Sequence, residues 1–152
     1  MNKYIKNIIE DYTYPIIKSL TYSNGDMLIF DGHKVNDNYI LRILCKSSID
    51  SYFQYNEESY ISHFSVLTSE ENSKYSIFAG EGSWGNDGIV FAMDKEYEKP
   101  LWFFFLDNSD PFVRIQFETA DVIVIQSSSG LNIRIPIDSP ENLKVISSSN
   151  IR

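Results

Sequence analysis

Apolar residues recur at every second position through much of this chain, and this period of two is the feature that most restricts its fold. Successive side chains of a β-strand point to opposite faces, so the pattern predicts strands with one buried and one exposed face. The clearest case is 131–137, where Leu and Ile alternate with Asn, Arg and Pro. Strands are predicted over 38–46, 60–67, 74–79, 89–93, 101–106, 112–118, 122–125 and 131–137.

Two of these strands carry further expectations. Residues 122–125 are apolar at every position, which predicts a central strand that is covered on both faces. Pro136 cannot donate a ladder hydrogen bond, so it should lie on a sheet edge or at a strand end. Residue types that tolerate positive φ mark turns at 23–26, 86–88 and 127–130.

The two ends of the chain predict helices. Ile5, Ile8, Ile9 and Tyr12 follow the helical spacing i, i+3, i+4 and i+7, and the helix must end before Pro15. The sequence at 139–141, Ser-Pro-Glu, is typical of a helix start, so a short helix of about two turns is expected there. Residues 147–152 are expected to form a frayed tail.

These elements predict the fold class α+β, mostly β. A length of 152 residues, without internal repeats or a linker, favours a single domain over 1–152. We expect one curled antiparallel or mixed sheet, filled by aromatic side chains, with a short N-terminal helix and a short C-terminal helix.

The charge balance restricts the partners. The chain has 13 Lys and Arg against 21 Asp and Glu, a formal net charge of -8. This balance argues against direct binding of nucleic acid and suits a basic protein partner. The longest apolar run, 101–106, is about six residues against the roughly twenty of a membrane span, so no membrane span is expected.

The residues for nucleophilic or metal chemistry are sparse. A single cysteine, Cys45, rules out an internal disulfide framework and a multi-cysteine metal site, which favours a reducing, cytoplasmic location. Cys45 is expected to be a small buried hydrophobe, His33 to lie in a turn-like stretch, and His63 to lie in a strand. A Cys45–His63 dyad across neighbouring strands is conceivable, but the sequence favours structural roles, no enzymatic activity, no metal and no cofactor.

Four of the seven glycines gather at 80–88, and the segment 80–85 matches G-x-G-x-x-G. A dinucleotide site requires a helix after this turn, but 89–93 predicts a strand. We therefore interpret the glycines as a sharply bending backbone that leaves Trp84 exposed or wedged.

Two carboxylate groups remain. Asp107 and Asp110 lie in a turn-like Asp-Asn-Ser-Asp-Pro segment, whose spacing does not match an EF-hand loop. Glu57, Glu58, Glu70 and Glu71 bracket a predicted strand, with Tyr52, Phe53 and Tyr55 nearby. Solvated turns and a partner-facing acidic patch are both compatible with these groups.

The segments 80–91, GEGSWGNDGIVF, and 101–112, LWFFFLDNSDPF, resemble small immunity proteins of bacterial polymorphic toxin systems, including contact-dependent growth inhibition. The resemblance implies a cytoplasmic, non-enzymatic protein that binds the C-terminal domain of one cognate toxin, often a nuclease, and occludes its active site or a neighbouring surface. An acidic inhibitor would complement a basic toxin. The candidate toxin-binding residues are Glu81, Trp84, Asp87, Asp107 and Asp110, and the alternative patch is Glu57, Glu58, Glu70 and Glu71.

Two other functions stay open from the sequence. One is a small-ligand or carbohydrate-binding β module, with Trp84, Trp102 and tyrosines as stacking platforms. The other is a small hydrolase that uses Asp107 and Asp110.

Overall fold

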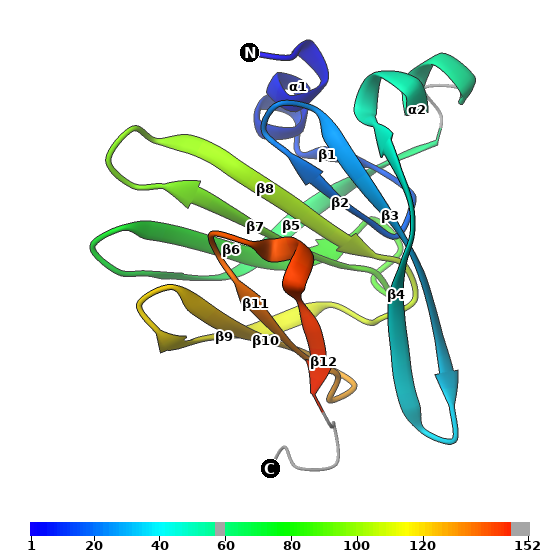
Figure 1. Cartoon of the computed structure of the whole chain (residues 1–152), viewed down its shortest axis with the longest axis vertical. Helices are drawn as coiled ribbons and strands as arrows, with labels where there is room; N and C mark the ends of the chain where they lie inside the picture. The colour runs from blue at the N-terminus through cyan, green and yellow to red at the C-terminus, as the bar shows by residue number, and fades with distance from the viewer. Residues whose placement is uncertain (57–59, 147–152) are drawn as a thin grey trace.

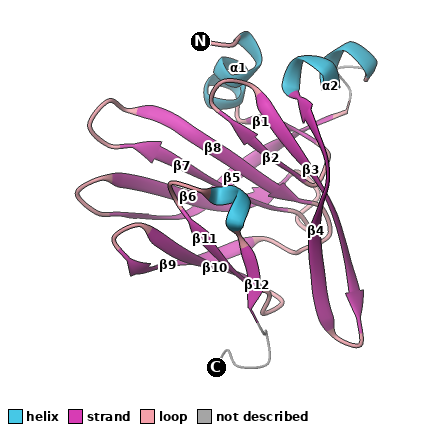
Figure 2. Cartoon of the chain, in the orientation of Figure 1, coloured by secondary structure: helices cyan, strands magenta, loops and turns pink. Residues whose placement is uncertain are grey.

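The computed structural model describes residues 1–56 and 60–146 and shows a mostly β protein with two short α-helices (Figure 2). The elements are α1 (Lys3–Asp11), β1 (Thr13–Pro15), β2 (Ser19–Tyr22), β3 (Asp26–Val35), β4 (Asn38–Ser48), α2 (Ile49–Tyr55), β5 (Ile61–Glu71), β6 (Tyr75–Gly82), β7 (Gly88–Asp94), β8 (Lys99–Leu106), β9 (Phe112–Thr119), β10 (Val122–Ser127), β11 (Asn132–Pro136), η1 (Pro140–Asn142) and β12 (Lys144–Ile146). No helix within these two ranges is long and apolar enough to cross a membrane.

The strands form two sheets, so the prediction of a single curled sheet is wrong. The larger sheet has eight strands in the order β1-β5-β6-β7-β8-β2-β3-β4, and the smaller has four in the order β12-β11-β10-β9. Every strand pairing is antiparallel. The chain leaves β8 through the turn at 107–111, and the meander β9–β12 then folds back across one face of the larger sheet (Figure 1).

The strand β8 explains why two covering layers are needed. Trp102, Phe104 and Leu106 belong to the core between the two sheets, whereas Phe103 and Phe105 belong to the core on the opposite face. All five side chains are at most 1% exposed. A strand that is apolar on both faces must be covered on both faces. The four-stranded sheet covers one face, and the helical layer covers the other.

The helical layer packs on Phe103 and Phe105 through Ile5 and Ile8 of α1 and Ile49 of α2. Asn2 caps the start of α1, because its side-chain oxygen accepts a hydrogen bond from the Tyr4 backbone N–H at 2.9 Å. The helix ends at Asp11, before Pro15, as its spacing predicted.

Several sequence predictions need correction. The expected cover on both faces of 122–125 is wrong, since Ile123 and Ile125 are buried and Val122 and Val124 are only half-buried. The segment 31–34, expected to be a turn, lies inside β3. The expected C-terminal helix is only the 3-10 turn η1, and β12 follows it and pairs with β11.

Other predictions hold. All eight predicted strands are present, and Pro136 is the last residue of β11, as its missing N–H requires. The predicted tail at 147–152 lies outside the described residues.

A close packing arrangement joins β3 and β4. The Tyr39 hydroxyl is buried without a hydrogen-bond partner among the described residues, and burial raises the pKa of Tyr39 to about 12. A side chain at Gly32 would meet this hydroxyl, and also Leu41 at 3.1 Å. The absence of a Cβ at Gly32 therefore leaves the space that the tyrosine hydroxyl occupies.

We predict coupled effects at these two positions. Tyr39→Phe removes an unpartnered buried hydroxyl and should raise the free energy of unfolding by about 1 kcal/mol. Gly32→Ala should lower it by roughly 1–3 kcal/mol through overpacking, and by less in the Tyr39→Phe background. Urea unfolding of the four proteins measures the coupling. Equal losses for Gly32→Ala in both backgrounds would contradict this packing.

Candidate functional site

The two sequence motifs meet at one place. The turn between β6 and β7 and the turn between β8 and β9 are joined by three hydrogen bonds. The Asn86 side chain donates to the Asn108 side chain at 3.0 Å, the Asp110 N–H donates to the Asn86 carbonyl at 2.9 Å, and the Asn108 N–H donates to Asp87 Oδ1 at 3.0 Å. We call residues 81–88 and 107–111 the paired-turn surface.

Trp84 is the most exposed candidate on this surface. Its side chain is 82% exposed, although tryptophan is usually well buried. The turn that carries it includes Gly85, which has a φ of 76° that favours glycine. The Ser83 N–H donates to Ser62 Oγ at 3.0 Å, which ties the same turn to β5.

The four candidate carboxylates differ in their surroundings. Asp87 is only 4% exposed, and desolvation raises the pKa of its carboxyl. The hydrogen bond from the Asn108 N–H lowers this pKa, but by a smaller amount. Asp107 forms an ion pair with Lys18. Glu81 and Asp110 are half-buried, and neither has an ion-pair partner among residues 1–56 and 60–146. Asp87 therefore holds the turns together, whereas Glu81 and Asp110 remain uncompensated charges.

The neighbouring glycines serve packing. A Cβ at Gly80 would collide with the Ser65 carbonyl, beside the irregular pairing of β5 with β6. A Cβ at Gly88 would lie 2.7 Å from the ring of Phe112, which is fully buried. No helix follows Gly85, so the G-x-G-x-x-G match is a strand–turn–strand, as the sequence indicated.

The alternative acidic patch is not a single surface in the described residues. Glu70 and Glu71 end β5, and Glu71 pairs with Lys95 at 3.4 Å. The aromatic residues of α2 precede the other end of this 11-residue strand. Tyr52 is also buried, and Phe53 stacks on Tyr4 with ring centroids 4.4 Å apart. Glu57 and Glu58 lie outside the described residues.

The structure corrects the chemical candidates. Cys45 is exposed, not buried, and five strands separate β4 from β5, which excludes the Cys45–His63 dyad. Trp102 is 1% exposed and donates from Nε1 to the Ile137 carbonyl at 2.9 Å, so it offers no stacking platform. Over 1–56 and 60–146, no three His, Cys, Asp or Glu residues are grouped as a metal site would need.

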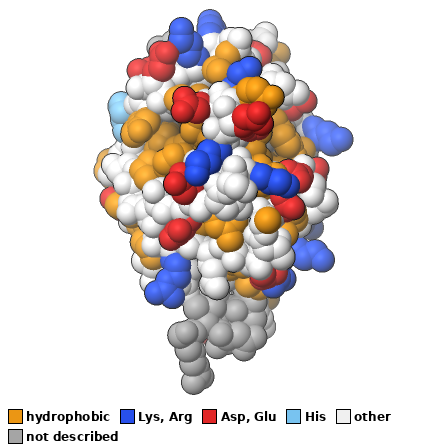
Figure 3. Space-filling view, turned by 90° about the vertical axis from the view of Figure 1, so that its left-hand side faces the viewer, with side chains coloured by type: hydrophobic (Ala, Val, Ile, Leu, Met, Phe, Trp, Pro, Cys, Tyr) orange, Lys and Arg blue, Asp and Glu red, His pale blue; other side chains and the backbone are white. Residues whose placement is uncertain are grey.

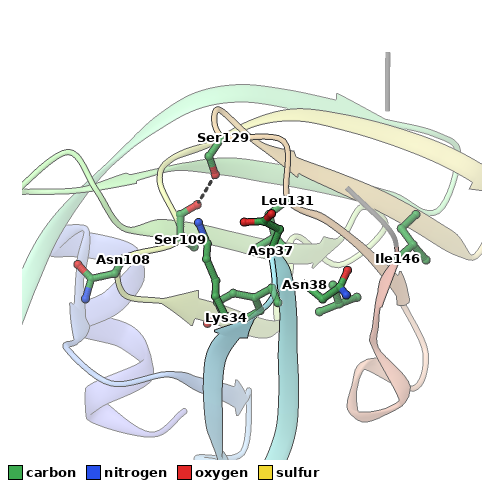
Figure 4. Close-up of a pocket in the computed structure, with 10 residues that line it drawn as sticks. Lys34, Asp37, Asn38, Asn108, Ser109, Ser129, Leu131 and Ile146 are labelled. Atoms are coloured by element: carbon green, nitrogen blue, oxygen red, sulfur yellow. Dashed lines mark hydrogen bonds between the residues drawn. The ribbon is translucent and has the colours of Figure 1, made fainter. Parts of the chain in front are cut away.

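A cavity of about 510 Å³, which was not predicted from the sequence, lies beside the paired-turn surface. Its polar wall includes Lys34, Asp37, Asn38 and Asn108, and Figure 4 shows Ser129 hydrogen-bonded to Ser109 on the same wall. Tyr39, Leu131, Val145 and Ile146 form its apolar wall. These residues come from segments far apart in the sequence, so no local motif marks the cavity.

A smaller apolar groove lies between α1 and the larger sheet. Ile9 of α1 and Tyr12, which directly follows the helix, line it together with Phe78 and Met93 of the sheet. On the side of the molecule toward which the β5–β6 and β7–β8 hairpins point, hydrophobic side chains reach the surface among charges of both signs (Figure 3). Mixed charges there contrast with the uncompensated carboxylates of the paired-turn surface.

We predict that Asp87→Asn keeps the fold, because an amide oxygen can still accept from the Asn108 N–H. The raised pKa means that the folded protein holds this proton more tightly than the unfolded chain does, so ionisation of Asp87 opposes folding as pH rises. The variant should therefore be at least as stable as the parent at pH 7, with an advantage that shrinks toward pH 4. Urea unfolding at several pH values measures this difference. A difference that does not change with pH would contradict it.

Comparison with known proteins gives no relative: no family model, no curated protein and no solved structure matches this chain.

Proposed function

We propose that this protein neutralises a basic bacterial toxin domain, of the nuclease class, by binding it through the paired-turn surface. The observation that carries the proposal is Trp84, 82% exposed on a turn that hydrogen bonds hold in place. The resemblance of 80–91 and 101–112 to immunity proteins supports it from the sequence.

The charges of the molecule favour a basic partner. The formal net charge is -8, and Glu81 and Asp110 contribute carboxylates without an ion-pair partner among the described residues to the same paired-turn surface as Trp84. A nuclease surface that binds phosphates is basic, so long-range attraction would speed its encounter with this protein. Carboxylates at the interface would occupy positions that substrate phosphates need.

The rigidity of the paired turns favours tight binding. Ordering a flexible loop on association costs free energy, and a loop that is already ordered avoids this cost. The hydrogen bonds of Asn86, Asn108 and Asp87 order these turns in the free protein. An exposed tryptophan on such a support is the residue type that dominates protein interfaces. In this mechanism the inhibitor blocks access to the toxin and performs no chemistry itself.

We predict that Trp84→Ala weakens binding to the cognate toxin domain by at least about tenfold, because a central tryptophan supplies much of the binding energy. The domain to test is a basic toxin domain encoded by a neighbouring gene. Tyr97→Ala is the matched control: Tyr97 is 66% exposed, but it lies in the turn between β7 and β8. Titration calorimetry and rescue of growth on co-expression measure the effect. Parent-like binding by Trp84→Ala would exclude the paired-turn surface, and failure of the parent to bind would exclude the function.

The cavity favours a second candidate, a saccharide-binding module. A volume of about 510 Å³ suits a small ligand, and amide, carboxylate and hydroxyl groups beside Tyr39 are the groups that bind sugars. Under this candidate, millimolar glucose or N-acetylglucosamine should shift backbone amide NMR signals around Asn38 and Asn108. Asn38→Ala should remove the shifts, and the exposed Gln54→Ala should not. Absence of shifts with both sugars would contradict the candidate.

A further inference from the structure

The strand β4 is a long open edge of the larger sheet. It runs for 11 residues, and within residues 1–56 and 60–146 it pairs only with β3. At the opposite edge of this sheet, β1 has three residues, all buried, and pairs with Ile61–His63 of β5, while β9 of the smaller sheet packs near β5. Figure 1 shows the β3–β4 hairpin extending well beyond the rest of the larger sheet.

The edge of β4 carries exposed apolar side chains between the charges of Arg42 and Lys46. Ile40 is 43% exposed, Ile43 is 47% exposed and Leu44 is 60% exposed. Charges and a bulge are features that limit pairing at natural edge strands, but β4 is long, and its exposed apolar side chains can serve as a template for a strand with complementary charges. Burying these three side chains against a partner would remove apolar surface from water.

In the part of the chain that the structure describes, no strand pairs with the outer backbone donors and acceptors of β4. The Phe30 N–H donates to the Lys18 carbonyl at 3.0 Å, so Phe30 faces β2 and its neighbour Asp31 faces β4. Asp31 is opposite Arg42, which places the peptide groups of Arg42 toward β3. The peptide groups of Leu41 and Ile43 therefore point away from the sheet.

We propose that a second copy of this chain pairs with β4 to form a two-fold symmetric antiparallel dimer, centred where Leu41 of each copy meets Leu41 of the other. The charges of the β3–β4 hairpin are complementary in this arrangement because of a bulge. Leu44 is an extra residue of β4, since Ile43 is opposite Phe30 and Cys45 is opposite Ile29. Counted past the bulge, Cys45 of one copy comes opposite Asn38, the first residue of β4 in the second copy, so Lys46 lies next to Asp37 in the turn that precedes that strand.

In this register, the residues that meet across the interface lie on the same side of the sheet. Lys46 is opposite Leu28, which belongs to the core between the sheets, and Asp37 lines the cavity with Tyr39 on that same side. Ile43 of one copy then meets Tyr39 of the second copy on this face. Ile40 meets Arg42 on the other face, and symmetry makes each of these pairs occur twice.

Two neighbouring registers also place residues of the core side opposite residues of the core side, but their contacts are less favourable. A shift in one direction places Arg42 opposite Arg42 of the second copy, which is a direct repulsion. A shift in the other direction brings Ile43 next to Asp37 in the turn and carries Lys46 past the end of β4 of the second copy. Only the register centred on Leu41 brings the ammonium group of Lys46 next to the carboxylate of Asp37.

Sedimentation velocity of the full chain, from about 1 to 500 µM in reducing buffer, tests the proposal. We expect a concentration-dependent dimer whose dissociation constant rises about tenfold in Lys46→Glu, because two attractions become two repulsions. Asp37→Asn, which suits the φ of 68° at this position, should weaken the parent dimer but strengthen the Lys46→Glu dimer.

This reversal of sign distinguishes direct pairing of the two charges from a general effect of net charge. Lys99→Glu makes the same change in charge at the start of β8, away from β4, and should leave the dimer within about twofold of the parent. A monomer at every concentration overturns the proposal. So does a dimer in which Asp37→Asn has the same effect in both backgrounds. Toxin binding is measured separately, so either proposal can fail without the other.

Discussion

The aromatic strand β8 determines the architecture of this protein. Its side chains alternate between two cores: Trp102 and Phe104 fill the space between the sheets, and Phe103 and Phe105 fill the space under the helices. Both neighbours of β8 are strands of the same sheet, β7 and β2, so its backbone is hydrogen-bonded on both sides. Such a strand is stable only at the centre of a layered structure. The helical layer and the four-stranded sheet are therefore both needed to cover the apolar run 101–106 and its neighbours.

The same strand shows how far the sequence predicts the fold. The period of two identified the eight main strands, because burial of one face is a local property of a strand. The number of sheets depends on which strands pair, and that information lies between distant segments. Gly25, Gly32 and Pro15 interrupt the pattern over 13–35, so β1, β2 and β3 were not predicted, and β12 lies where a helix was expected. A signal for α2 was present, since Ser48 caps it by accepting from the Ser51 N–H at 3.0 Å.

The candidate site was predicted in part for a related reason. Each motif marks a turn, and turn chemistry is local, so both turns of the paired-turn surface were found. That Asn86 and Asn108 would join them follows only from the pairing of β7 with β8, which brings the two turns to the same end of the sheet. The burial of Asp87 and the exposure of Trp84 depend on that arrangement as well. Residue type alone gave Asp87 and Asp110 equal weight, although only Asp110 keeps an uncompensated charge.

The β3–β4 hairpin connects the three surfaces of interest. Between Gly32 and Ser48 it carries Lys34, Arg42 and Lys46 against the single carboxylate of Asp37, in a chain whose net charge is -8. Asp37 lines the cavity, and the cavity also contacts Asn108 of the paired-turn surface. If Asp37 bonds to Lys46 of a second copy, it is less free to accept a hydrogen bond from a ligand in the cavity. A ligand bound through Asp37 and a dimer formed through Asp37 are therefore competing states, and linkage requires each to weaken the other by the same factor.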